Sequence, residues 1–200
     1  MKSRLIMILA ACAMVIALAS GLRAQTLSTD IVFLKAGYVP LYTYELDTGV
    51  NAPVDYSGFA IQGEYNLNFN NFWLGFAVEY SRLYFDSKPD IIHSFLTPRV
   101  SAKLAAAGGL YIGAGLSGKY LISVVMPSGG KDEPDKKIDL WADGILGYYL
   151  PIAEAVFLDL EGRFGYNLTR QQFADNNDVK YNYDIAVYLG IGYRAAMSDY

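Results

Sequence analysis

Apolar and polar side chains alternate with a period of two through most of this chain. The alternation runs through eight segments: 31–46, 58–69, 72–85, 91–104, 109–124, 138–150, 156–168 and 181–194. Successive side chains of a β-strand point to opposite faces, so this period is typical of strands with one apolar face. After the first 25 residues no apolar run reaches the ~18 residues that a membrane helix needs. The sequence therefore predicts an all-β fold of eight antiparallel strands.

Two of the eight segments are less regular, and each contains a proline. Pro40 lies within 31–46 and Pro98 within 91–104. Because proline removes one donor from the ladder of hydrogen bonds, we expect a bulge or a frayed end at both positions.

The connections between the segments alternate in length. Longer polar connections are expected at 47–56, 86–90, 126–137 and 169–180, and short ones at 70–71, 105–108 and 151–155. Long loops at one end and tight turns at the other are typical of an up-and-down barrel that spans an outer membrane. An even number of strands then places both chain ends on the turn side, which is the periplasm.

The composition indicates which face of the strands points outward. The chain is 53% hydrophobic and only 18% charged, whereas a soluble domain carries about a quarter charged residues. The interior of an eight-stranded barrel is just wide enough for side chains to fill. Some forty large apolar residues do not fit there, so the apolar face is expected to contact lipid. The alternative is a soluble lipocalin-like cup, whose apolar face lines the cavity.

Aromatic residues fall near the ends of the segments, where two membrane girdles are expected. The loop-side girdle would comprise Tyr42, Tyr44, Tyr80, Tyr84, Tyr120, Phe164, Tyr166, Tyr181 and Tyr183. The turn-side girdle would comprise Phe69, Phe72, Tyr148 and Tyr193. Arg82 also points outward, near the loop end of its strand, where a cation costs only about 0–1 kcal/mol.

Residues 1–24 are predicted to be a cleaved signal peptide, which leaves 25–200 as the outer-membrane barrel domain. Lys2 and Arg4 precede an apolar stretch from Leu5 to about Ala19. The alternatives are cleavage after Ser20, a retained membrane anchor, and a lipoprotein acylated at Cys12.

The strand count, the alternating connections and the closing segment Ile185–Tyr193 resemble the small eight-stranded outer-membrane proteins of the OmpA and OmpX kind. The resemblance is architectural and covers about residues 31–194. It implies that the last strand carries the signal for the barrel-assembly machinery. In that family this strand ends the chain on an aromatic residue, whereas here seven residues follow Tyr193.

Charged side chains are predicted to point into the barrel. They are Lys35, Glu64, Glu79, Arg99, Lys103, Lys119, Asp139, Asp143, Asp159, Glu161, Arg163, Asp184 and Arg194. Seven of these fall near one level and are expected to form an interior charge network: Lys35, Glu64, Glu79, Arg99, Asp143, Glu161 and Arg163. Unpaired charges in a narrow interior are costly, so we expect a mutually paired plug. A gate whose pairs switch and let ions through is the sharper alternative.

No catalytic, cofactor or metal site is predicted. The sequence beyond the leader lacks cysteine, and His93 is the single histidine. An enzyme of lipid-modifying type would need a histidine with a serine or carboxylate on the same face, whereas the adjacent Ser94 would face the other way. Glu64 and Glu79 are a formal acid/base pair with no sign of a substrate cleft.

The net charge of −4 argues against nucleic acid as a partner. We expect a monomer that contacts outer-membrane lipid and binds any host or surface ligand through loops 47–56, 126–137 and 169–180. Acidic stretches at 131–137 and 175–178 leave weak calcium binding open.

The predicted function is a structural or surface-interaction barrel of a bacterial outer membrane, with extracellular loops and periplasmic termini. The alternatives are a narrow channel for ions or small solutes, a lipid-modifying enzyme and a soluble periplasmic binder.

Overall fold

The computed structural model describes residues 29–46, 53–106, 108–126, 138–169, 171–172 and 178–195. The strands are β1 (Thr29–Leu46), β2 (Pro53–Phe69), β3 (Phe72–Phe85), β4 (Lys88–Ala105), β5 (Leu110–Val125), β6 (Ile138–Pro151), β7 (Val156–Asn167), β8 (Gln171–Gln172) and β9 (Asp178–Ala195). No helix long enough and apolar enough to cross a membrane occurs in this part of the chain. The predicted signal peptide, residues 1–24, lies outside the described residues.

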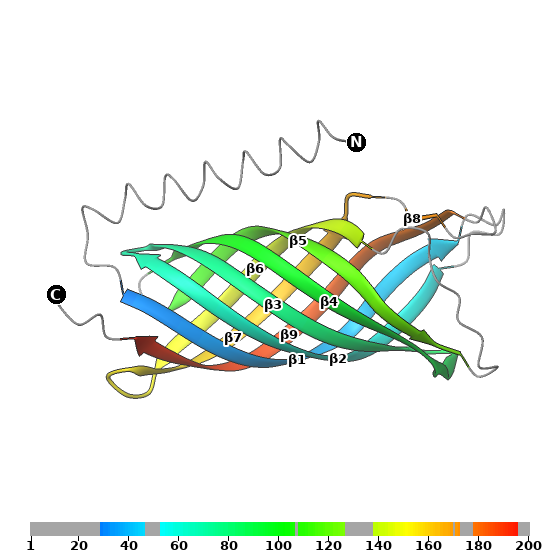
Figure 1. Cartoon of the computed structure of the whole chain (residues 1–200). Helices are drawn as coiled ribbons and strands as arrows, with labels where there is room; N and C mark the ends of the chain where they lie inside the picture. The colour runs from blue at the N-terminus through cyan, green and yellow to red at the C-terminus, as the bar shows by residue number, and fades with distance from the viewer. Residues whose placement is uncertain are drawn as a thin grey trace.

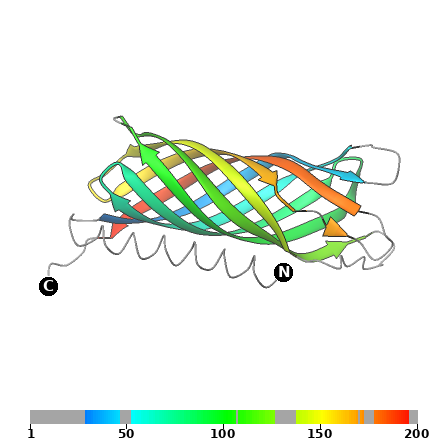
Figure 2. The ribbon, with the colours of Figure 1, turned by 90° about the horizontal axis from the view of Figure 1, so that it is seen from above.

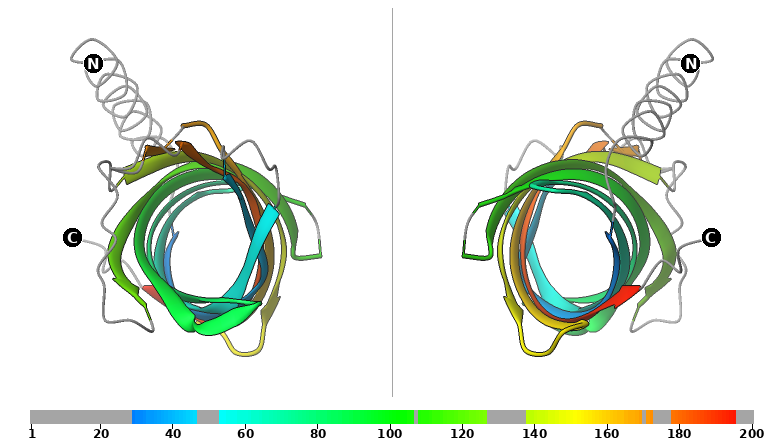
Figure 3. Two further views of the ribbon diagram at one scale, coloured as in Figure 1. Left: turned by 90° about the vertical axis from the view of Figure 1, so that its right-hand side faces the viewer. Right: turned by 90° about the vertical axis from the view of Figure 1, so that its left-hand side faces the viewer.

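Eight of these strands form a closed antiparallel barrel (Figures 1 and 2). Each long strand pairs with its neighbours in chain order, and β9 pairs with β1 from Asp30↔Ala195 to Leu46↔Val179. The end-on views show the resulting tube (Figure 3). The very short β8 pairs with β9 at Gln171↔Val179, beyond the last β7–β9 pair, Tyr166↔Tyr183. The predicted eight-stranded up-and-down barrel is confirmed.

The first strand begins and the last strand ends at the same end of the barrel, which also holds the short turns after β2, β4 and β6 (Figure 1). Asn70 adopts φ 57° in the two-residue turn between β2 and β3, a conformation that asparagine tolerates. We call this the turn end and the opposite one the loop end.

The expected loop at 86–90 is wrong, because a two-residue turn at 86–87 joins β3 directly to β4. The backbone N–H of Asp86 donates to the carbonyl oxygen of Asp55 over 3.1 Å, and the Ser57 hydroxyl donates to the Asp86 carboxylate over 2.8 Å. Residues 88–90 are exposed. They extend β4 without an apolar face, so the alternation gives no sign of them.

The two prolines behave differently. The register of β1 shifts around Pro40 against both neighbours, between Val39 and Tyr42 on the β2 side and between Tyr38 and Leu41 on the β9 side. The expected bulge is therefore present. At Pro98 the expectation is wrong, because Pro98 pairs in register with Val78 while the ladder between β4 and β5 passes over it without a shift. The missing donor is accommodated on one side of the strand.

The apolar face points outward, as predicted. Large side chains such as Leu34, Ile112 and Leu189 are more than 60% exposed on the outer wall. The side chains that alternate with them include most of the charged residues and are buried inside. This arrangement contradicts the soluble cup, in which the apolar face would line the interior.

Six of the predicted girdle residues are exposed on the outer wall, whereas Tyr42 and Phe69 are buried. Tyr80, Tyr120, Phe164 and Tyr166 on the loop side, and Tyr148 and Tyr193 on the turn side, are exposed on the outer wall. Tyr42 is instead only 1% exposed and points inward. The bulge at Pro40 adds one residue to β1, and a shift of one residue moves each later side chain to the other face. The side chains of Tyr44 and Tyr181 lie outside the described residues.

Candidate functional site: the filled interior

Near the turn end, a group of five charged side chains forms what we call the turn-side charge cluster: Lys35, Glu64, Lys103, Asp159 and Glu161. Lys35 Nζ lies 2.7 Å from Glu64 Oε2, 2.6 Å from Asp159 Oδ2 and 2.7 Å from Glu161 Oε2. An ammonium group has three donors, and here three carboxylates surround it.

A second ammonium group and a phenol complete this cluster. Lys103 Nζ donates to Glu64 and, over 2.9 Å, to Glu161 Oε2. The Tyr111 hydroxyl oxygen lies 2.8 Å from Asp159 Oδ1 and 3.0 Å from Glu161 Oε2. The two lysines therefore bridge the same two glutamates, and all these groups are held by five different strands, β1, β2, β4, β5 and β7.

Gln62 joins this cluster to a second one nearer the loops. Its amide nitrogen donates to Glu64 Oε2 over 3.0 Å, and its amide oxygen accepts from Arg99 Nη1 over 2.7 Å. Gln62 is 1% exposed, and its neutral amide keeps the buried charges on either side connected by hydrogen bonds.

The second group, the loop-side charge cluster, contains Glu79, Arg99, Lys119, Asp143, Arg163 and Asp184. Arg99 spans two acids, with 3.0 Å between its Nη2 and Glu79 Oε2 and 3.0 Å between its Nε and Asp143 Oδ2. Arg163 also donates to Glu79, which accepts a further hydrogen bond of 2.7 Å from the Tyr188 hydroxyl.

All seven side chains of the predicted network lie inside the barrel, and each takes part in at least one of these ion pairs. The sequence pattern placed Lys103, Lys119, Asp159 and Asp184 on the inner face, but at other levels. It did not single out Gln62, Tyr111 or Tyr188. Tyr111 and Tyr188 lie in phase with the charged and glycine positions of their strands. This phase would have predicted that both tyrosines point into the barrel.

Aromatic residues fill the interior between the charge clusters and the loop end. Four rings form what we call the loop-side aromatic layer: Tyr42, Tyr56, Phe95 and Trp141. The Tyr42 ring stacks on Trp141 with centroids 5.6 Å apart and lies 5.5 Å from the Phe95 ring. Lys119 Nζ sits 3.6 Å from the centroid of the Trp141 ring while it pairs with Asp184, so it connects this layer to the charges below.

Another layer fills the turn end of the interior. This turn-side aromatic layer contains Phe33, Trp73, Tyr149 and Phe157. The Tyr149 ring contacts both Trp73 and Phe157, with ring centroids 4.9 Å and 6.1 Å apart, respectively. The two charge clusters are thus enclosed between two layers of rings, which the sequence pattern did not predict.

Glu64 and Glu79 pair with different cations and do not face each other as an acid/base pair. Glu64 is held by Lys35 and Lys103, whereas Glu79 is held by Arg99 and Arg163. His93 is buried beside the loop-side aromatic layer, where its ring stacks on Tyr56 at 4.8 Å. Among the described residues there is no group of three or more His, Cys, Asp or Glu suited to holding a metal ion.

A closed eight-stranded antiparallel barrel with an apolar wall and a filled interior defines the class of fold, which is that of the small outer-membrane β-barrels. Comparison with solved structures agrees with the predicted resemblance. Neisserial surface protein A is 18% identical, with a TM-score of 0.58 over 85% of this chain and 100% of that chain. The outer membrane protein OprG from Pseudomonas aeruginosa is 11% identical, with a TM-score of 0.58 over 84% of this chain and 97% of that one.

The outer membrane protein AlkL, determined in lipid bilayers, is 13% identical, with a TM-score of 0.56 over 86% of this chain and 92% of that one. No protein-family model matches the sequence, and no curated protein matches it either. At these levels of identity the likeness establishes the fold and assigns no role to individual residues.

Proposed function

We propose that the protein is an integral barrel of the bacterial outer membrane with a structural or surface-interaction role, and that its interior does not conduct. The single observation that carries this proposal is the continuous set of interior ion pairs between the two aromatic layers. An ion would have to separate buried pairs and displace packed rings on its way through, and both steps are costly.

The outer wall supports residence in a membrane. A belt of exposed Leu, Ile, Val and aromatic side chains encircles the barrel, and only a lipid environment makes so large an apolar surface favourable. The short turns, the start of β1 and the end of β9 all lie at the turn end of the barrel. This end would therefore face the periplasm, and the loops at the opposite end would be extracellular.

Contacts with partners are proposed for the loop end. Of the loops expected at 47–56, 126–137 and 169–180, residues 53–56 belong to β2, 171–172 to β8 and 178–180 to β9. Most of the remaining loop residues lie outside the described residues, so the loops enter the proposal through their position alone. The β1–β9 closure leaves no long free edge in the wall, which supports a monomer. Assembly would depend on the barrel-assembly machinery, as in other proteins of this architecture.

The proposal includes no catalytic role. His93 is packed among aromatic rings inside the barrel, and its neighbour Ser94 lies on the opposite face of β4. A lipid-modifying centre would have to present its histidine to the outer wall, where lipid is found. Loss of a lipid modification on His93→Ala would contradict this part of the proposal.

The test is conductance in planar bilayers. We expect insertion of the purified protein to produce no unitary current steps, with insertion checked by recovery of the folded barrel from the bilayer. Regular steps would contradict the proposal and favour the narrow channel. In that case a changed ion selectivity in Arg163→Gln would assign the conducting path to the interior, because Arg163 lies within it.

A further inference from the structure

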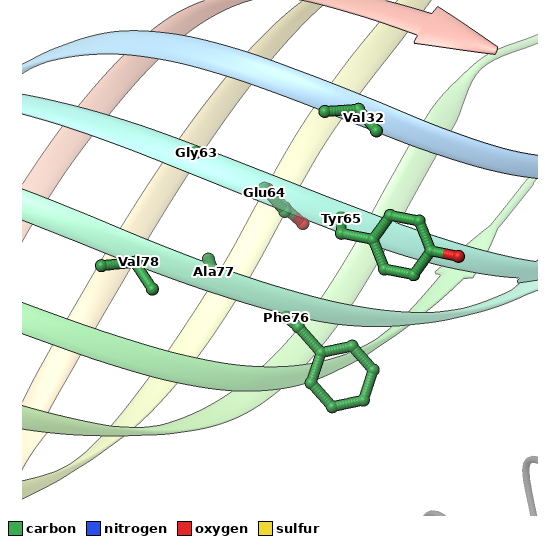
Figure 4. Close-up of a pocket in the computed structure, with 7 residues that line it drawn as sticks. All are labelled: Val32, Gly63, Glu64, Tyr65, Phe76, Ala77 and Val78. Carbon is green, nitrogen blue, oxygen red and sulfur yellow. The ribbon is translucent and has the colours of Figure 1, made fainter. Parts of the chain in front are cut away.

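The outer wall contains a depression where β1, β2 and β3 run side by side. Its volume is about 300 Å³, and it is lined by Val32, Gly63, Glu64, Tyr65, Phe76, Ala77 and Val78 (Figure 4). Gly63 faces outward and forms the floor. A Cβ atom added to Gly63 would meet no other atom within 4 Å, so the depression exists because this position lacks a side chain.

Apolar side chains form the walls of the depression. Val78 is paired with Gly63 across the sheet, and it is 54% exposed. Toward the turn end, the rings of Tyr65 and Phe76 lie on adjacent strands and close that side (Figure 4). The Tyr65 hydroxyl donates to the Asp30 carboxylate, which fixes the ring.

The surroundings identify what can reach this place. Leu34, which pairs with Gly63 on the β1 side, and Ile61 are 62% and 58% exposed. Nearer the loops the rings of Tyr38 and Phe59 lie side by side with centroids 5.7 Å apart. The depression therefore opens into the apolar belt, where the surrounding medium would be lipid chains.

We propose that the Gly63 depression is the binding site for one acyl chain of a membrane phospholipid. The proposal rests on the membrane insertion proposed above. The walls are stiff, because valine has few side-chain conformations and Tyr65 is hydrogen-bonded, so they do not close over Gly63. A void forfeits dispersion contacts along its lining, and a flexible chain restores them. A lipid held there would leave more slowly than lipids around the rest of the wall.

The test uses native mass spectrometry on barrels refolded into vesicles of phosphatidylethanolamine and phosphatidylglycerol and then extracted into mild detergent. We expect the wild type to retain one phospholipid. Gly63→Leu should lower the fraction of barrels with bound lipid about tenfold, the loss that corresponds to burying roughly two fewer methylene groups. Gly144→Leu is the matched control, since Gly144 also faces outward and its Cβ would meet only the Phe164 carbonyl oxygen, at 3.9 Å, but it lines no part of the depression, so this variant should retain the lipid.

Four results would overturn the proposal. Equal retention by Gly63→Leu and the wild type would show that lipid binds elsewhere. A dimer that Gly63→Leu abolishes, with no lipid retained, would assign the depression to a second copy of the chain. Failure of the wild type to form a heat-modifiable barrel in the vesicles would remove the proposed membrane function together with this site, whereas a folded barrel that carries no lipid would remove the site alone.

Discussion

Among single residues, Lys35 has the most demanding surroundings. Its ammonium group is 1% exposed and is the shared partner of Glu64, Asp159 and Glu161, while only Lys103 provides a second positive charge in that cluster. Removing one member of a buried ionic group leaves the others uncompensated in a medium of low polarity, a change that costs about 3–5 kcal/mol.

We therefore expect Lys35→Met, which keeps the length of the side chain, to lower the free energy of unfolding by about 3–5 kcal/mol. Urea titration of the barrel in lipid vesicles measures this change. Arg82→Met is the control, because Arg82 is an exposed cation on the outer wall whose neighbour is the Tyr84 ring, and its loss should change stability by less than about 1 kcal/mol. Equal stability of Lys35→Met and the wild type would mean that water, rather than the lysine, compensates the carboxylates.

On the inner face of the barrel wall, large side chains of one strand pack over glycines of the neighbouring strand. Tyr111 of β5 pairs with Gly147 of β6, and its ring occupies the space that a side chain at 147 would take. From there its hydroxyl reaches Asp159 and Glu161 of β7. The glycine thus sets the position of a ring that spans three strands.

Gly147→Ala is expected to destabilise the barrel by about 1–3 kcal/mol, because the added Cβ would overlap the Tyr111 ring and displace it from both acids. The same vesicle titration checks this. Gly162→Ala offers a matched comparison, since its Cβ would approach no atom closer than 3.7 Å, and we expect a change within about 0.5 kcal/mol. If the two variants lost equal stability, backbone effects of alanine, rather than contact with Tyr111, would explain the result.

The alternation in the sequence predicts the strands of the barrel better than it predicts their ends or the faces of single residues. Alternation located all eight wall strands, because each of them has one face against lipid and one face inside. It failed where strands extend past the membrane belt, as at 88–90, and where the count along the strand changes, as at Tyr42. Pro40 signalled the bulge, but the sequence did not show on which face the residues after it would fall.

On the scale of the whole molecule, the interior was predictable in part. The parity of the charged residues placed them inside, and the number of strands gave a lumen narrow enough to require pairing. The pairing of cations with acids depends on the register between neighbouring strands. The alternation of side chains does not predict that register. The aromatic layers were missed because the pattern left rings such as Phe33 and Trp141 unassigned, although their positions along the strands place them on the same face as Lys35 and Asp143.

Closure between the first and last strands predicts how the whole molecule behaves in detergent. The β1–β9 ladder joins residues near opposite ends of the chain, so among the described residues every long strand is hydrogen-bonded to a neighbour on each side. No complete strand is left as an edge that detergent or another chain could invade. The interior ion pairs and ring layers add contacts that must break together. We expect protein extracted from the outer membrane to migrate faster on a detergent gel when unboiled than when boiled. A chain shortened by residues 181–200 should lose this difference, because it lacks most of the strand that pairs with β1. Recovery of the wild type as a soluble periplasmic protein with no mobility shift would contradict the assignment of the apolar wall to lipid.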